Sequence, residues 1–217
     1  TSSVPNKTGQ PSCYKSGQFI CSLHLHIGFL VWPRKWFRMG QYFAGVRFTA
    51  EVTQAGDGML QAGSVAPDFD LPDADMEMVK LSDFKGKKNV VLYFYPKDDT
   101  PGCTIEAIEF SDIDDELANL DTVVIGVSRD DCISHAAFRD KHGLAVRLLA
   151  DTEGEVCQMY GVWQEKEKDG VKKMGIVRST FIIDKKGIIR HALYGVNPRG
   201  HAQEVLALIK EMHPCKS

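Results

Sequence analysis

The sequence predicts an α/β domain built on a mixed, mostly parallel central sheet that helices flank. Short apolar runs rich in β-branched residues alternate with amphipathic segments from residue 59 onward. This alternation is typical of parallel strands joined by helical crossovers. Near the C-terminus two such runs flank the turn at residues 184–187, which indicates a hairpin and hence one antiparallel strand. With 217 residues, the chain is long enough for one such domain and an extension.

An extended segment and a buried strand open the domain. Pro67 and Pro72 exclude a helix from residues 63–72, and residues 78–82 can form a short edge strand. After a turn, residues 89–95 read Asn-Val-Val-Leu-Tyr-Phe-Tyr. Such a continuous run of apolar, β-branched and aromatic residues is typical of a strand buried on both faces.

A helix is predicted to follow this strand directly. Thr100 is a suitable N-cap, and Pro101 suits the first helical position. Apolar residues spaced three and four apart extend the predicted helix to Leu120. The remaining elements continue the alternation: a strand at 122–128, a helix at 132–142 that Gly143 ends, a strand at 146–149, a short helix at 153–160, a charged surface loop at 164–173, strands at 176–183 and 188–194, and a helix at 200–212. This order matches a thioredoxin-like sandwich with an N-terminal extension.

The N-terminal quarter differs in composition from the rest of the chain. Residues 1–50 contain six basic and no acidic side chains, whereas residues 59–217 contain 20 basic and 27 acidic ones. We therefore expect residues 1–58 to be a leader and residues 59–217 to be the domain. The most apolar stretch, residues 18–32, is interrupted by two histidines and is shorter than the roughly 20 apolar residues of a membrane-spanning helix. An organelle transit peptide fits the missing acids but not the aromatic content.

The cysteine pattern indicates free thiols in a reducing compartment, and hence a cytoplasmic location. The six cysteines lie at positions 13, 21, 103, 132, 157 and 215. They form no C-x-x-C pair and no zinc-ligand spacing. The predicted domain also lacks a phosphate-binding loop and a basic nucleic-acid patch. We expect no metal, no nucleic acid and no membrane among its partners.

Cys103 is the residue most suited to chemistry. It is predicted to lie in the first turn of a helix that follows a buried central strand. The carboxyl ends of such strands carry functional groups in open α/β sheets. The unpaired N–H groups and partial positive charge at a helix start favour a thiolate. A thiol with a pKa of about 8.5 is only a few per cent ionised at pH 7, whereas a pKa of about 6 gives roughly 90% thiolate. The alternative is that Cys103 is simply a small buried residue.

The residues around Cys103 resemble the peroxidatic motif of peroxiredoxins, P-x-x-x-T-x-x-C. In this sequence the motif positions are Pro96, Thr100 and Cys103. Three further segments resemble the peroxiredoxin Q branch, also called bacterioferritin comigratory protein, at residues 66–69, 160–163 and 175–184. The resemblance covers about residues 59–213.

This resemblance implies a thiol-dependent peroxidase that reduces hydrogen peroxide and small organic hydroperoxides. The Cys103 thiolate would attack the O–O bond and become a sulfenic acid. Arg178 would hold the thiolate and the peroxide oxygens, Thr100 would hydrogen-bond the peroxide, and Pro96 would shield the sulfur from water. Electrons would come from thioredoxin or a similar dithiol, without metal, haem or flavin. The branch also implies a monomer or weak dimer.

The sequence departs from the family at the resolving cysteine. The two usual positions, five and 36 residues after the peroxidatic cysteine, hold Ile108 and Arg139. Cys132, Cys157 and Cys215 remain as candidates. Cys132 and Cys157 are predicted near the starts of neighbouring helices and would need local unwinding to approach Cys103 within disulfide distance. A one-cysteine cycle, in which an external thiol resolves the sulfenic acid, is the leading interpretation.

Two other functions remain open at this point. A redox sensor or holdase could use the same reactive thiol without turnover, because sensors and peroxidases share a thiol of low pKa. A thiol–disulfide oxidoreductase is less consistent with the sequence, since that chemistry needs an adjacent resolving thiol and C-x-x-C is absent.

Overall fold

The structure, a computed structural model, describes residues 59–168 and 171–213. The predicted leader, residues 1–58, and Cys215 lie outside the described residues, so the predictions that rest on them stay predictions. Within the described ranges no helix is long and apolar enough to cross a membrane.

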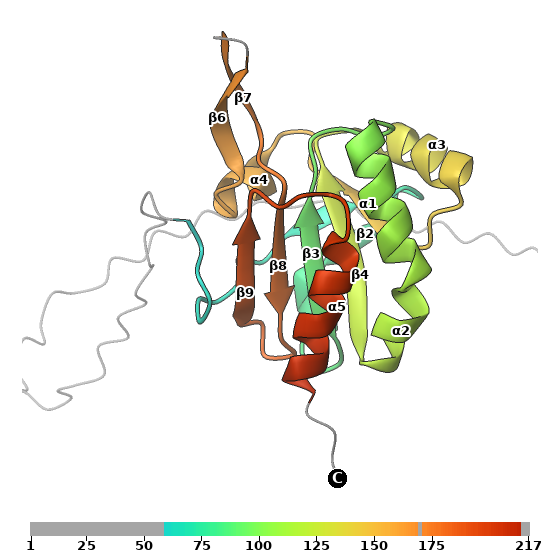
Figure 1. The fold of residues 1–217 in the computed structure, drawn as a ribbon, viewed down its shortest axis with the longest axis vertical. Coiled ribbons are helices and arrows are strands. Elements are labelled where there is room, and N and C mark those ends of the chain that lie inside the picture. The colour runs from blue at the N-terminus through green and yellow to red at the C-terminus, as the bar shows by residue number, and fades with distance from the viewer. Residues whose placement is uncertain (1–58, 169–170, 214–217) are drawn as a thin grey trace, which may run out of the picture. The chain divides into compact units, whose positions relative to one another are not determined.

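A five-stranded mixed sheet forms the centre of the domain (Figure 1). Its strands, in spatial order, are β5 (Arg147–Ala150), β4 (Thr122–Ser128), β3 (Asn89–Phe94), β8 (Ser179–Ile183) and β9 (Ile189–Tyr194). The first three run parallel, while β8 is antiparallel to both of its neighbours. Four of the five strands therefore point the same way, and the predicted mixed, mostly parallel sheet is confirmed.

Five α-helices pack around this sheet. They are α1 (Pro101–Asp112), α2 (Asp114–Asn119), α3 (Cys132–His142), α4 (Glu155–Met159) and α5 (His201–Met212). Side chains of β3 alternate between two cores, since successive residues of a strand point to opposite faces. Val91 and Tyr93 join the core formed by α1, α3 and α5, whereas Leu92 and Phe94 join the core that contains α4.

The core on the α4 side is closed by short extended elements. These are β1 (Asp70–Pro72), β2 (Met78–Lys80) and the 3-10 turn η1 (Leu81–Phe84). Phe69 and Leu81 from this region are buried there beside Tyr160. The predicted extended entry and edge strand thus pair with each other as a small ribbon, Leu71 opposite Val79.

Three local predictions were wrong, and the third concerns the strand predicted over residues 176–183, which is interrupted at residues 177–178. The helix predicted to continue to Leu120 breaks at Ile113, whose N–H bonds to the carbonyl of Phe110, three residues back, so that α1 and α2 are separate. The charged segment at 164–173 is an antiparallel ribbon of β6 (Trp163–Lys168) and β7 (Val171–Ile176), not a loop. Charged residues alone carry no strand periodicity, and main-chain pairing decides the structure here.

Candidate functional site

Cys103 lies in the first turn of α1, immediately beyond the end of β3. Thr100 has the extended backbone of an N-cap residue, and Pro101 is the first helical residue, as predicted. Cys103 is 2% exposed. The unpaired N–H groups of this turn and the helix dipole favour the thiolate form of a buried cysteine.

Arg178 brings a fixed positive charge to this sulfur. Its Nη2 donates a hydrogen bond to Cys103 Sγ over 3.2 Å. The arginine occupies the break between β7 and β8, where the apolar pattern predicted one strand over residues 176–183. The carbonyl of Arg178 accepts a bond from the N–H of Val196 rather than from a strand of the sheet. The interrupted strand thus directs the guanidinium towards the start of α1.

Glu106 holds the other arm of the guanidinium and was missed by sequence reasoning. It lies one turn after Cys103 and its side chain is fully buried. Its Oε2 accepts a hydrogen bond from Arg178 Nη1, while Oε1 has no partner among the described residues. Burial raises the pKa of the Glu106 carboxyl to about 7, against the opposing effect of Arg178. The available signal was an acid spaced three residues from Cys103, on the same helix face as Phe110.

Thr100 and Pro96 bracket the loop that leads from β3 into α1. The Thr100 hydroxyl donates to the carbonyl of Lys97 over 3.1 Å and makes no capping bond to the helix. The hydroxyl oxygen therefore keeps its lone pairs for another donor. Pro96 is exposed at the start of the loop.

A buried cluster of polar side chains around Asp98 anchors this loop to the rest of the domain. The Asp98 carboxylate accepts hydrogen bonds from Tyr95 and Ser134, each over 2.8 Å, and lies 2.9 Å from His135 Nδ1. The N–H of Asp98 donates to Asp130 over 2.8 Å. Burial disfavours the charge, but His135 and the two hydroxyls outweigh it and hold the pKa of Asp98 below its ordinary value. The loop is thereby attached to the first turns of α3.

The sequence of this chain matches a protein-family model. The model described as the AhpC/TSA family covers residues 62–192. The chain belongs to the AhpC/TSA family. The putative peroxiredoxin bcp of Coxiella burnetii is 46% identical over 147 residues, which are 68% of this chain and 97% of the relative. Peroxiredoxin Bcp of Bacillus subtilis is 46% identical over 153 residues, which are 70% of this chain and 97% of that protein.

Solved structures give the same result for the fold. The bacterioferritin comigratory protein of Xanthomonas campestris, described with alkyl peroxide reduction activity, matches with a TM-score of 0.65 and 32% identity, over 71% of this chain and 97% of that one. A PrxQ variant from Xylella fastidiosa matches with a TM-score of 0.68 and 34% identity, over 73% and 99%. The resemblance to the peroxiredoxin Q branch and the thioredoxin-like fold are confirmed. The chain is a thiol-dependent peroxidase, which acts on a peroxide and is reduced by a thiol.

The other described cysteines of this peroxiredoxin lie in different surroundings. Cys103, Cys132 and Cys157 are all free thiols. Cys157 is fully buried in the core on the α4 side, so the central sheet lies between it and Cys103. Burial, followed by Asp151, raises the pKa of Cys157 far above its ordinary value. Cys132, half-buried at the first position of α3, has a pKa raised chiefly by burial. Neither environment favours a thiolate.

The two family positions for a resolving cysteine carry other contacts in this peroxiredoxin. Ile108 is 37% exposed on α1. Arg139 on α3 donates to Asp75 over 2.7 Å and to the neighbouring Asp140 over 3.0 Å. Arg139 therefore ties α3 to the turn after β1.

Proposed function

We propose that Cys103 is the peroxidatic thiol and reduces hydrogen peroxide and small organic hydroperoxides. The observation that carries this proposal is the 3.2 Å hydrogen bond from Arg178 Nη2 to the buried Sγ. A guanidinium beside a sulfur at a helix start stabilises the thiolate, which is the attacking species. The S–O bond forms as the O–O bond breaks, and the departing alkoxide or hydroxide takes up a proton and leaves as alcohol or water.

The peroxide is positioned in this proposal by hydrogen bonds to Thr100 and Arg178 and is shielded from water by Pro96. The free lone pairs of the Thr100 hydroxyl accept a hydrogen bond from the O–H of the hydroperoxide, while Arg178 donates hydrogen bonds to the peroxide oxygens. Pro96 limits the access of water to the sulfur. Glu106 acts on the peroxide only through Arg178: it accepts from Nη1 and so fixes the direction of Nη2.

An external thiol completes the proposed cycle. A thiol attacks the sulfur of the Cys103 sulfenic acid, water leaves, and a second thiol reduces the mixed disulfide. Thioredoxin or a similar dithiol supplies both thiols in one molecule. The burial of Cys157 behind the sheet and the raised pKa of Cys132 support this one-cysteine cycle over an internal disulfide. We also place the protein in the cytoplasm, as a monomer or weak dimer.

Peroxide consumption by the wild type and by Cys103→Ser, with thioredoxin or dithiothreitol as donor, tests the proposal. Turnover should vanish in Cys103→Ser, and unchanged turnover would exclude Cys103 as the peroxidatic thiol. Rapid oxidation of Cys103 without turnover by any donor would identify a sensor instead. Mass spectrometry of peroxide-treated protein should find a lone sulfenic acid, whereas a disulfide to Cys132, Cys157 or Cys215 would overturn the one-cysteine cycle.

A further inference from the structure

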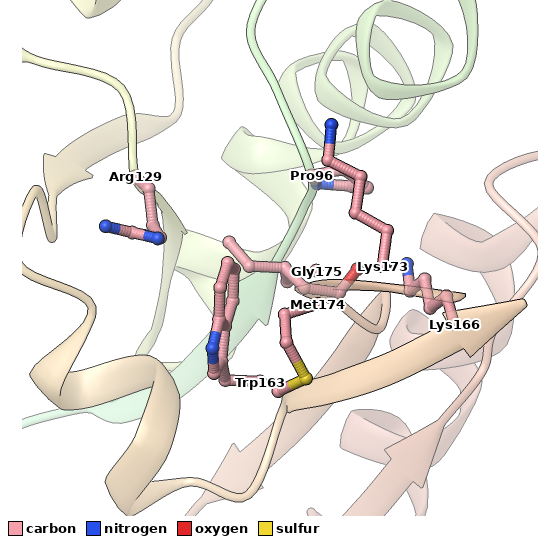
Figure 2. Close-up of a pocket in the computed structure, with 8 residues that line it drawn as sticks. Pro96, Arg129, Trp163, Lys166, Lys173, Met174 and Gly175 are labelled. Atoms are coloured by element: carbon pink, nitrogen blue, oxygen red, sulfur yellow. Dashed lines mark hydrogen bonds between the residues drawn. The ribbon is translucent and has the colours of Figure 1, made fainter. Parts of the chain in front are cut away.

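A pocket of about 420 Å³ lies beside Pro96 (Figure 2). It lies between the β6–β7 ribbon and the loop that leads from β3 into α1, which we call the active-site loop. Pockets of a few hundred cubic ångströms commonly accept small organic molecules. Figure 2 shows Trp163 and Arg129 on one side of the pocket, Lys166 on the other, and Met174 between them. The pocket therefore combines an apolar floor with cationic walls.

The cations of this pocket are not balanced by acids. Lys166 and Lys173 are direct partners in the β6–β7 register, and like charges directly opposite each other destabilise a ribbon. Neither lysine has a carboxylate within ion-pair distance among the described residues, and no acid lines the pocket. By contrast, the adjacent Lys172 pairs with Glu165 over 2.8 Å. Two facing, unbalanced lysines on one pocket are suited to a bound anion.

The third cation is held in place by an aromatic ring. The Arg129 guanidinium lies 4.7 Å from the centre of the Trp163 ring, and Nη2 donates to the carbonyl of Thr152 over 3.1 Å. This stacking fixes the arginine at the pocket wall, and no acid among the described residues that line the pocket compensates its charge. An anion in the pocket would thus meet positive charge on both sides.

Lys166 connects the pocket to the reactive sulfur. Its ammonium donates to the carbonyl of Ile176, two residues before Arg178. Burial and then the charge of Arg178 lower the pKa of Lys166, while Cys103 opposes the shift. Lys166 therefore lies within electrostatic reach of both Arg178 and Cys103, and Pro96 belongs both to the pocket and to the active-site loop.

We propose that this pocket gives the enzyme a preference for organic hydroperoxides that carry a carboxylate. The carboxylate binds between Lys166 and Lys173, the apolar part lies on Trp163 and Met174, and the hydroperoxide group extends past Pro96 towards Cys103. The reaction is the one proposed above, on which this inference rests. The oxidised sulfur keeps one peroxide oxygen, and the other leaves as an alcohol that bears the carboxylate.

Single-turnover oxidation of the reduced full-length chain tests this preference without any reductant. The chain is mixed with cumene hydroperoxide or its para-carboxylate derivative, quenched with an alkylating reagent and analysed by mass spectrometry. The carboxylate derivative should oxidise Cys103 about two- to fivefold faster than the neutral compound at low salt. The advantage should shrink as ionic strength rises, because salt screens partly exposed charges.

Two variants and a matched control locate the effect. Lys173→Gln should remove most of the preference, and Lys173→Glu should reverse it. The rate with hydrogen peroxide should stay unchanged in both, which shows that Cys103 and Arg178 are intact. Lys172→Gln, on the same ribbon but paired with Glu165, should behave as wild type. Equal rates for the two cumene compounds, or an equal loss in Lys172→Gln, would overturn the inference.

Two further outcomes separate this inference from the function it rests on. If Cys103 reacts rapidly with hydrogen peroxide but shows no carboxylate preference, only the inference fails. If no peroxide oxidises Cys103, the proposed function itself fails. A Lys173→Gln effect confined to reduction of the sulfenic acid by an anionic thiol would assign the pocket to the reductant and overturn its role towards the peroxide.

Discussion

His135 Nδ1 lies 2.9 Å from the Asp98 carboxylate, in a pair that protein encloses almost completely. Asp98 belongs to the loop that carries Thr100, whereas His135 belongs to the first turns of α3. The pair therefore joins two segments that the chain separates by 37 residues. It holds the active-site loop against α3 and so fixes where Thr100 lies relative to Cys103.

Asp98→Asn tests this anchoring. The asparagine side chain has one oxygen that accepts hydrogen bonds and one NH₂ group that only donates. It therefore cannot accept all the bonds from Tyr95, Ser134 and His135, and at least one buried donor loses its partner. We expect a loss of about 1 to 3 kcal/mol in the free energy of unfolding, measured by urea denaturation. Oxidation of Cys103 should also slow as the loop loosens.

Asp99→Asn is the matched control for Asp98→Asn. Asp99 is the next residue in the loop, and its exposed carboxylate accepts from Lys141 and His142. The unfolding free energy should change much less than in Asp98→Asn, because exposed ion pairs contribute little. Equal effects of the two substitutions would contradict the anchoring role of Asp98.

Arg178→Lys tests the geometry of the cation rather than its charge. Lysine keeps the positive charge but cannot donate to Cys103 Sγ and Glu106 at once through a planar fork. We expect the rate of Cys103 oxidation, followed by alkylation and mass spectrometry, to fall about 100-fold. Arg190→Lys, which alters a surface pair with Asp184, is the control. A wild-type rate in Arg178→Lys would reduce the role of the arginine to charge alone.

Glu106 gives the fold a pH dependence of definite sign. The pKa of its carboxyl is raised from 4.5 to about 7 in the folded protein, so the folded state binds more protons between these values. Stability contributed by the protonated carboxyl is therefore present below pH 4.5 and is lost as pH rises towards 7. This loss is on the order of 3 kcal/mol for a shift of this size.

Comparison of wild type with Glu106→Gln isolates this contribution, because glutamine does not titrate. The difference in unfolding free energy between the two proteins should move in favour of Glu106→Gln as pH rises from 5 to 7.5. Urea denaturation at several pH values measures it. A difference independent of pH would mean that Glu106 is ionised throughout this range.

A chain that begins at Met59 should fold and retain full peroxidase activity. Tyr194 Oη donates to the carbonyl of Leu60 over 3.3 Å, and Met59 Cα lies close enough to Gly161 to contact a side chain placed there. The domain therefore uses its residues from this point onward. Circular dichroism, thermal unfolding and peroxide turnover of the truncated chain are the measurements.

A shorter chain that begins at Ser64 provides the comparison for this truncation. It removes the Leu60 carbonyl and the bond from the Gly63 N–H to Ile189, and we expect a lower melting temperature. Loss of folding in the chain that begins at Met59 would instead show that the leader belongs to the domain.

The sequence by itself determined the strands at the centre of the sheet and the place of Cys103 at the start of a helix. The apolar run at residues 89–95 and the Thr100–Pro101 helix start are local signals, readable from neighbouring residues. They place Cys103 in the first turn of α1 independently of the tertiary contacts that the rest of the chain makes. The charge difference between the two ends of the chain likewise needs no structure.

Only the tertiary structure decided which distant side chains meet. Arg178 reaches Cys103 from 75 residues away because the strand pattern breaks at that arginine, and no local periodicity predicts such a break. The burial of Glu106 depends on what packs against α1, and the ribbon at 163–176 depends on main-chain pairing between charged strands. Cys157 lies behind the sheet because α4 crosses to the face opposite α1. Each of these outcomes is a contact between segments far apart in the chain, which the pattern within one segment does not encode.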